Sequence, residues 1–420
     1  MVTVENQIKA DLSRTIYLAL IFFSLLNYAV NGIYAGMKYK GGDFLNYYVI
    51  AKLLLAEVNI HDDQLRESAI EELQVQNPHL QIKKFHQPDY PPFWYMVLSP
   101  LTAFSYEIAF GIWLSLNQFF LFAALYLLFK YFNIRIISLE GAFSITLFLN
   151  FYPLWYNMME GQVNVFLLLL IIGGLQAFKK DSHCLAGLLL GLAASIKIVP
   201  ALLIFYFLLK GHWRVVFWSA VCFAFTVAFS LITVNPELVL HYFTSQIFKY
   251  GNVPRPEHFN QSINGFVSRL FTDSRASHGW IDNPFFSRII TIILSLVVLS
   301  SSIYFSRGKF PKSGVKWNLG FALFITAMLM MSSWTLEHHF VFLYFVWLAM
   351  LEALIHNGGF KMQNSLLSAL LFIFLAVFIP YQSSRFAGGI FIPILSLKFY
   401  AVTLLWFIVG INLYRSARTT

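Results

Sequence analysis

The stretch CLAGLLLGLAASIKIVPALLIFYFLL, residues 184–209, decides how this chain must fold. It is apolar apart from Lys197, and Pro200 follows three residues later. Proline cannot continue the hydrogen-bond ladder of a helix, and a lysine at membrane depth needs a polar partner or water. We therefore expect a broken helical hairpin that turns back on itself and places Lys197 in the wall of a wet cavity, because interrupted backbone is tolerated there.

The composition around this stretch indicates an all-α polytopic membrane protein. Hydrophobic residues make up 58% of the 420 and charged residues only 12%, which one water-soluble core could not bury. The first apolar run, 16–30, has no cleavage signature after it and is interpreted as a retained signal anchor with a cytoplasmic N-terminus. The net charge of +9 falls mainly in short loops, which is the positive-inside bias of membrane proteins and not a nucleic-acid surface.

A helix needs about 20 apolar residues to cross a bilayer, and about 10–13 membrane helices are expected on that basis. Further embedded helix is expected at 92–105 and 184–209. The predicted spans are 15–34, 107–130, 137–156, 161–178, 213–234, 285–306, 316–334, 340–355, 364–380 and 395–414.

Charges in the short loops predict the sidedness. The basic loops and tail assigned to the cytoplasm contain Lys130, Arg135, Lys179, Lys180, Arg307, Lys309, Lys312, Lys316, Arg415 and Arg418. The long polar segments 35–91 and 235–284 then lie outside. Three apolar segments separate Lys180 from Arg307, and an odd number of crossings cannot return the chain to its own side. The hairpin at 184–209 restores the parity, so the whole chain, 1–420, is predicted to be one membrane domain with two extracytoplasmic loops.

Asp43 begins a predicted amphipathic helix over 43–58 that lies at the membrane surface. Its apolar face carries Phe44, Tyr47, Tyr48, Ala51, Leu54, Leu55 and Val58, while Asn46, Lys52 and Glu57 fall elsewhere. As a first residue, Asp43 is read most simply as an N-cap. The alternative is a general base at the mouth of the cavity.

Other polar side chains lie at the same predicted outer face. Asp89 is a second candidate carboxylate, and it precedes Tyr90 and a proline pair typical of a rigid connector. Gln162 and Asn164 open a membrane helix with carboxamides that suit sugar hydroxyls or phosphate oxygens, although capping explains them equally well.

The segment from His258 to Arg269, which includes Asn260 and Gln261, is more polar than a simple connection needs. His338 and His339 follow Glu337 at the outer end of a span, where a proton relay, phosphate contacts or an ordinary wet interface would each place histidine. Neighbouring helical residues point about 100° apart, so the two rings fit no standard zinc motif. Cys184 and Cys222 sit at or inside apolar segments and suggest neither a disulfide nor a metal site.

Several of these motifs, taken in order, resemble glycosyltransferase family 87, a GT-C group of polytopic enzymes that includes mycobacterial polyprenyl-phosphate-mannose-dependent mannosyltransferases. The likeness runs from about residue 40 to 340 and is carried by Gly42-Asp43-Phe44 with Tyr47-Tyr48 and Ala51-Lys52, Tyr90-Pro91-Pro92, Glu160-Gly161-Gln162-Val163-Asn164, Ala186-Gly187, Gly191 to Pro200 and Asn260-Gln261-Ser262. The segment Asn59-Ile60-His61-Asp62 departs from the family pattern, which leaves the acceptor undefined.

The resemblance implies a GT-C-like bundle and an inverting transferase that takes a hexose, mannose in the first instance, from a polyprenyl phosphate and passes it to a glycolipid or glycan. The implied base is Asp43, which favours catalysis over capping. Phosphate and sugar binding is expected from Lys197, Gln162, Asn164, Arg269, His338, His339, Asn260, Gln261 and His258, with Asp89 and Tyr90 as secondary candidates. No cofactor is implied, and dependence on a divalent metal stays open at this point.

The expected setting is a bacterial plasma membrane, with both termini cytoplasmic and an extracytoplasmic active site. The expected partners are the lipid-linked sugar, the acceptor and membrane lipid, without nucleic acid. A transporter or flippase also uses broken helices, but repeated halves and acidic residues within spans are not seen here. An O-antigen ligase or polymerase would be expected to carry more basic outer loops, and a sensor or assembly subunit would carry no chemistry.

Overall fold

The computed structural model describes residues 2–76, 89–274, 277–312, 314–356, 362–380 and 386–418. These residues form helices and connecting turns, without a strand among them; two isolated bridges join Asp273 to His278 and His278 to Gly388. The all-α prediction is confirmed.

The first third of the chain contains α1 (Val2–Tyr28), the π-helical turn η1 (Ala29–Tyr34), α2 (Ala35–Tyr39), α3 (Gly42–Leu55), α4 (Asp63–Gln76), α5 (Pro92–Leu98), the 3-10 turn η2 (Ser99–Ala103), α6 (Tyr106–Tyr131) and α7 (Leu139–Leu149). The middle contains α8 (Tyr152–Glu160), α9 (Asn164–Lys179), α10 (His183–Ile196), α11 (Ala201–Leu209), α12 (Trp213–Thr233), α13 (Pro236–His241), η3 (Tyr242–Gln246) and α14 (Ile247–Asn252). The last part contains α15 (Ile263–Phe271), α16 (Pro284–Phe305), α17 (Val315–Met331), η4 (Glu337–Phe342), α18 (Leu343–Ile355), α19 (Met362–Ala376), η6 (Gly389–Ser396) and α20 (Leu397–Arg418).

Six described segments are long and apolar enough to cross a membrane: Asp11–Tyr39, Tyr106–Tyr131, Trp213–Thr233, Pro284–Phe305, Glu337–Ile355 and Gly389–Arg415. The pair α8 and α9 adds a further candidate, bent by 115° at its break. Apolar helices of 10–17 residues supplement them, among them α7, α10 and α17. The chain is therefore a polytopic membrane protein, as predicted.

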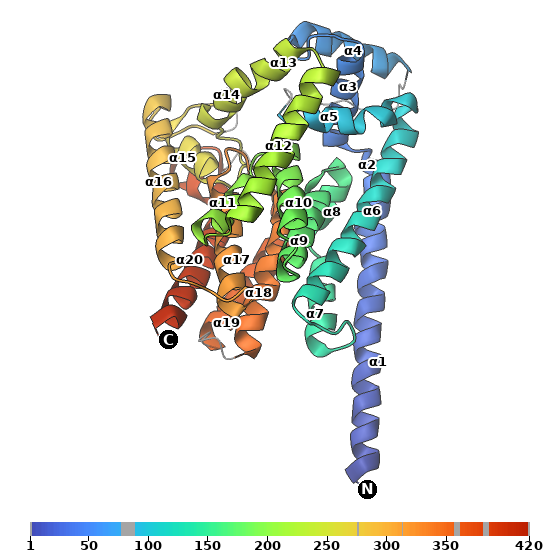
Figure 1. Ribbon diagram of the computed structural model, residues 1–420, viewed down its shortest axis with the longest axis vertical. Coiled ribbons are helices and arrows are strands. Elements are labelled where there is room, and N and C mark those ends of the chain that lie inside the picture. Colours follow the sequence, from blue (N-terminus) through green and yellow to red (C-terminus); the bar gives the residue numbers. More distant parts are fainter. Residues whose placement is uncertain are drawn as a thin grey trace.

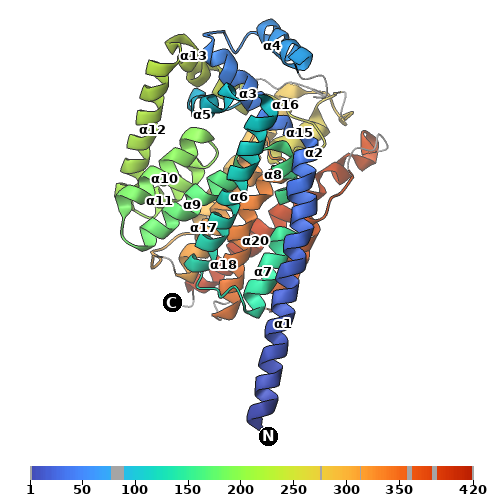
Figure 2. The same ribbon diagram turned by 90° about the vertical axis from the view of Figure 1, so that its right-hand side faces the viewer.

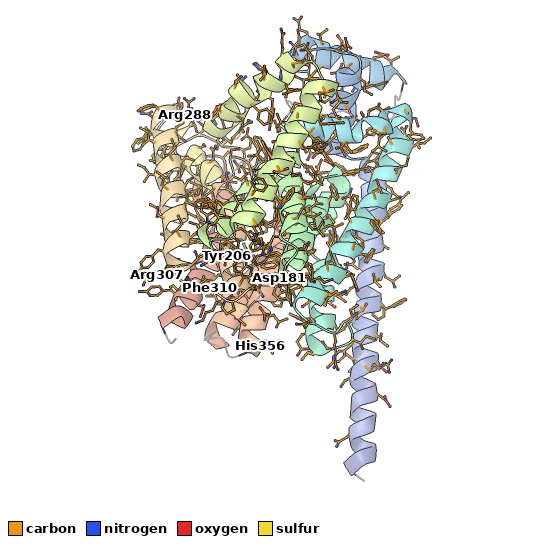
Figure 3. All side chains as sticks on the ribbon, viewed as in Figure 1. Asp181, Tyr206, Arg288, Arg307, Phe310 and His356 are labelled. Atoms are coloured by element: carbon orange, nitrogen blue, oxygen red, sulfur yellow. The ribbon has the colours of Figure 1, made fainter. Side chains whose placement is uncertain are left out.

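The two chain ends lie at the same end of the molecule, and α3, α4, α5 and α13 gather at the other (Figure 1). A quarter turn shows the same separation (Figure 2). Arg288 and Arg307 mark opposite ends of α16 (Figure 3). Helices α3 and α4 of the first long polar segment thus share with α13 of the second the end of the molecule that is farthest from both termini.

The predicted break at 197–200 is confirmed. Helix α10 ends at Ile196, Lys197 adopts extended backbone (φ −144°, ψ 126°), and α11 starts at Ala201 after Pro200. Helix α10 packs against both α11 and α12. Proline supplies no amide to the ladder, so the interruption follows directly from the sequence.

The predicted span 137–156 is wrong as a single helix. Helix α7 ends at Leu149, and α8 begins at Tyr152 with Pro153 in its first turn. Phe151 is the N-cap of α8 and has extended backbone, as N-cap residues usually do. The Asn150 side chain donates to Thr146 O at 2.7 Å and accepts from Asn27 at 2.5 Å, so the break is held by hydrogen bonds.

The predicted surface helix is more enclosed than expected. Helix α3 contacts α4, α5, α6 and α8, and Asn46, assigned to its polar side, is only 8% exposed. Lys52 and Leu55 remain exposed. The helix is therefore built into the body of the protein instead of resting one apolar face on lipid, which fixes the position of Asp43.

Candidate active site

Asp43 is the second residue of α3, and the N-cap is Gly41, whose φ of 69° suits glycine. The N-cap reading of Asp43 is therefore wrong. The Asp43 carboxylate is half-buried and accepts a hydrogen bond from Gln162 Nε2 at 2.5 Å. Sequence segments 119 residues apart thus meet at the predicted base.

The tight turn between α8 and α9 places Gln162. Gly161 has φ 64°, and its carbonyl accepts from Trp113 Nε1 at 2.7 Å. The amide of Gly41 donates to Met159 O at 3.1 Å, which ties the start of α3 to the end of α8. The bend between α8 and α9 therefore brings Gln162 within hydrogen-bond distance of Asp43.

Two buried tyrosines extend the network inward. Tyr47 OH and Tyr90 OH each donate to Gln162 Oε1, at 3.0 and 3.1 Å, and their rings meet edge to face at 5.1 Å. With its oxygen used by the tyrosines, the Gln162 amide nitrogen is directed to Asp43. Tyr47, predicted only as part of an apolar face, is a polar contributor that sequence reasoning missed.

Lys197 lies at the inner end of this network. Its ammonium donates to Tyr90 OH at 3.3 Å and to Asn164 Oδ1 at 3.4 Å, and it lies 2.5 Å from His339 Nε2. Asn164 in turn donates to Asn157 Oδ1 at 3.2 Å. Lys197 and His339 also line a cavity whose other walls are largely apolar, formed by Val199, Pro200, Met328, Leu329, Ser332, Thr335 and Phe342. The predicted cavity lysine is therefore found beside a cavity.

The tautomer of His339 follows from its other contact. The Leu336 amide donates to His339 Nδ1 at 2.8 Å, so the proton of a neutral ring belongs on Nε2. Nε2 lies 2.5 Å from the Lys197 nitrogen, a distance at which the two groups share one hydrogen. Each of these nitrogens could instead donate to an anionic oxygen of a bound substrate.

Lys398 was not identified from the sequence, although it supports the histidines. It is fully buried and forms an ion pair with Glu337, and it also donates to Val377 O at 2.7 Å. Glu337 directly precedes His338 and His339 in η4. The pair therefore anchors the turn that carries both histidine rings.

A separate network holds the remaining polar candidates. Asn260 donates to Ser333 O and accepts from the Thr335 amide. Gln261 donates to Leu395 O and accepts from the Phe399 amide. Arg269 is fully buried and donates to the backbone carbonyls of Glu257 and Asn260 and to Ser396 Oγ. These contacts bind the second polar loop to the segments around η4 and α20, and they do not bring Asn260, Gln261 or Arg269 to Asp43.

The remaining two candidate residues are His258 and Asp89. His258 packs against Phe259 at 4.9 Å, and burial together with Arg269 lowers the pKa of its imidazole. Asp89 is exposed, and its backbone carbonyl accepts from Tyr242 OH at 3.4 Å. Within the described part of the chain, no group of three or more His, Cys, Asp or Glu is arranged to hold a metal ion.

Comparison with known proteins finds two mannosyltransferases with similar sequences. A polyprenol-phosphate-mannose-dependent alpha-(1-2)-phosphatidylinositol pentamannoside mannosyltransferase of Mycolicibacterium smegmatis is 33% identical over 187 residues, 43% of each chain. The protein of the same name from Mycobacterium tuberculosis is 35% identical over 119 residues, 28% of this chain and 27% of its own. The chain thus matches less than half the length of these curated relatives, and no solved structure gives a significant match.

The family match is broader than either alignment. The model of glycosyltransferase family 87 matches residues 89–333, which include Gln162, Asn164 and Lys197. Asp43 and His339 lie outside that range. Since the matched range exceeds half of the sequence, the chain belongs to glycosyltransferase family 87.

Proposed function

We propose that this protein is an inverting membrane glycosyltransferase that moves a hexose, with mannose as the first choice, from a polyprenyl-phosphate sugar to a glycolipid or glycan acceptor on the extracytoplasmic face. The choice of donor follows the relatives, which are named as polyprenol-phosphate-mannose-dependent mannosyltransferases. The phosphatidylinositol mannoside in their name supports a glycolipid as the kind of acceptor.

The continuous chain of side-chain contacts from Asp43 to Lys197 and His339 carries the proposal. Gln162 bridges Asp43 to Tyr90, and Tyr90 bridges Gln162 to Lys197. One network thus holds the Asp43 carboxylate, the Lys197 ammonium and the His339 imidazole. A largely apolar cavity lies beside Lys197 and His339. This arrangement suits a substrate that joins a sugar, a phosphate and a lipid.

In the reaction, Asp43 accepts the proton of the acceptor hydroxyl while that oxygen attacks the anomeric carbon. The bond between the anomeric carbon and the phosphate oxygen breaks on the opposite face, so the configuration inverts. The polyprenyl phosphate leaves with increased negative charge. Lys197 and His339 Nε2–H stabilise that charge, and they do so most effectively where water is scarce. Gln162 holds the Asp43 carboxylate in position, and Asn164 accepts from the Lys197 ammonium.

Asp43→Asn tests the role of the base. Asparagine keeps the hydrogen bond from Gln162 but cannot take a proton, so we expect transfer to fall by about 100-fold or more while donor binding stays within about 2-fold. The measurement uses purified protein, radiolabelled polyprenyl-phosphate mannose, and n-octyl α-mannoside or a membrane glycolipid fraction as acceptor.

Asp62→Asn is the matched control. Asp62 caps the start of α4, accepting from the Gln64 and Leu65 amides at 2.9 and 3.2 Å, and is not in the site network. Asparagine caps helices about as well as aspartate, so this variant should transfer normally. Normal turnover by Asp43→Asn would remove Asp43 from the base role, and a wild-type protein that transfers no sugar to either acceptor would overturn the proposed function.

A further inference from the structure

A second group of polar side chains lies beside Asp43 and plays no part in the mechanism above. Glu160 ends α8 and is 7% exposed. Its carboxylate interacts with the hydroxyls of Tyr39 and Tyr156 and with the backbone amide of Asp43. Gly42 lies so close that a Cβ there would come within 2.5 Å of Glu160 Oε2. Glu160 is therefore pressed against the first turn of the helix that carries the proposed base.

His338 joins this group from the other side of the chain. Its ring centroid lies 5.3 Å from that of Tyr156 and 4.4 Å from that of His339. His338 is 1% exposed, and neither ring nitrogen has a hydrogen-bond partner among the described residues. Burying an unsatisfied polar group is costly, so a ligand that supplies hydroxyl groups would remove a penalty already built into the fold.

The group begins at the protein surface. Tyr39 is 55% exposed and contacts the buried Glu160, and His338 is also buried. Tyr152 and Tyr156 stack nearly parallel, with ring centroids 5.9 Å apart and an interplanar angle of 7°. Flat aromatic faces pack against the C–H face of a sugar, and carboxylate, phenol and imidazole groups together donate and accept hydrogen bonds.

We infer that Tyr39, Tyr156, Glu160 and His338 form the binding site for the sugar of the acceptor, which adjoins Asp43 at Glu160 and the donor site around Lys197 at His338. This inference rests on the proposed function. The acceptor class that fits is a hexopyranoside headgroup: its hydroxyls bond to Glu160 and His338, and its ring packs on Tyr156. The hydroxyl that reacts then lies beside Asp43, which is held there by the contact of its own amide with Glu160.

The buried Glu337–Lys398 pair supports the assignment. It fixes the turn η4 directly before His338. The His338 ring, whose nitrogens have no hydrogen-bond partner among the described residues, is thus held in place before a ligand binds. Preorganised polar groups bind with a smaller loss of side-chain freedom. The same turn presents His339 to Lys197, so one element would align both substrates.

The test compares Tyr39→Phe and His338→Gln with Tyr34→Phe. Tyr34 lies on the same continuous helix as Tyr39 and is 64% exposed, outside the polar group. Initial rates are measured against n-octyl α-mannoside at saturating polyprenyl-phosphate mannose, and then against the donor at saturating acceptor. We expect the acceptor KM to rise about 3- to 10-fold in Tyr39→Phe and about 10-fold or more in His338→Gln, with the donor KM and the kcat at saturating acceptor nearly unchanged.

A purely structural role would lower kcat, raise both KM values or reduce the yield of folded protein. If wild type transfers sugar but the acceptor KM of both variants equals that of Tyr34→Phe, the acceptor-site inference is wrong and the proposed function stands. If wild type transfers no sugar to the alkyl mannoside or to membrane glycolipids, the proposed function itself fails. A rise in donor KM alone would assign these residues to the donor site and would also overturn the inference.

Discussion

Lys197 shows how one residue can define a site in a membrane protein. It ends α10, and its ammonium has neutral partners in Tyr90, Asn164 and His339, without a salt bridge to an acidic residue within the described chain. A cation in such surroundings is expensive to keep and marks a functional position. Asp43 and Asp89 act on Lys197 electrostatically without a salt bridge that the structure records, and the phosphate of a lipid-linked donor would add a further counter-charge.

Lys197→Met should therefore weaken donor binding. Methionine keeps the length and the apolar stem but removes the charge, so we expect an affinity for polyprenyl-phosphate mannose about 10- to 100-fold lower, the effect of losing one charge-assisted hydrogen bond. Binding is measured on detergent-solubilised protein with radiolabelled donor. Lys180→Met, at an exposed position after α9, is the control. Equal donor affinity in both variants would make Lys197 a structural lysine.

The residues that could be predicted were those whose chemistry conflicts with their surroundings. Lys197 stands out in an apolar run, and Asp43 begins a helix that family resemblance marks. Tyr90 was predicted only as a secondary candidate, and Tyr47 could not be separated from core residues, because a phenol looks the same in a sequence whether its ring or its hydroxyl matters. Lys398 was hidden for another reason: it sits at the start of an apolar segment, where an interfacial lysine is ordinary, and its partner lies 61 residues away.

At the scale of elements, the α8–α9 turn is the feature on which the site depends. Gly161 occupies left-handed backbone, and a Cβ there would lie 2.7 Å from Phe44 Cβ in α3. Left-handed backbone costs an L-residue about 1–2 kcal/mol, and Phe44 Cβ is too close to its own backbone to move aside. The turn therefore requires glycine for two independent reasons.

Gly161→Ala should lower the thermal unfolding temperature and also reduce transfer, because the strain falls on the turn that directs Gln162 to Asp43. Gly111→Ala is the matched control: Gly111 lies in α6, and its Cβ position has open space around it. Alanine within a helix is favoured over glycine, so that variant should be as stable as wild type or slightly more so. Indistinguishable melting curves for the two variants, measured in detergent, would show that the turn is not under the constraint described.

The breaks themselves were only partly predictable at this scale. The interruption at Lys197 and Pro200 was predicted because a proline in the middle of an apolar run cannot continue the hydrogen-bond ladder of a helix. The break between α7 and α8 was missed because Asn150 is a single polar residue within an otherwise apolar run, and a hydropathy average cannot tell one long helix from two short ones. The enclosure of α3 was missed for a related reason, since burial by neighbouring helices depends on contacts that periodicity does not contain.

At the scale of the whole molecule, the position of Asp43 relative to the termini bears on which side of the membrane the site faces. Both termini lie at one end of the structure, and α3, which carries Asp43, lies toward the other (Figure 1). A lipid-linked sugar and its acceptor can meet at Asp43 only if that end faces the compartment in which both are presented. The positive-inside bias predicts that this end faces the exterior, because Arg307, Lys309 and Lys312 follow the far end of α16.

Cysteine labelling along α16 tests this orientation within one helix. Arg288 and Arg307 are both exposed and lie at its two ends (Figure 3). In a background with Cys184 and Cys222 replaced, a membrane-impermeant maleimide added to intact cells should label Arg288→Cys and Lys52→Cys, the latter on α3. Arg307→Cys should react only after permeabilisation. The reverse pattern would put Asp43 on the cytoplasmic side, away from an externally presented donor, and the mechanism would fail however well its residues are arranged.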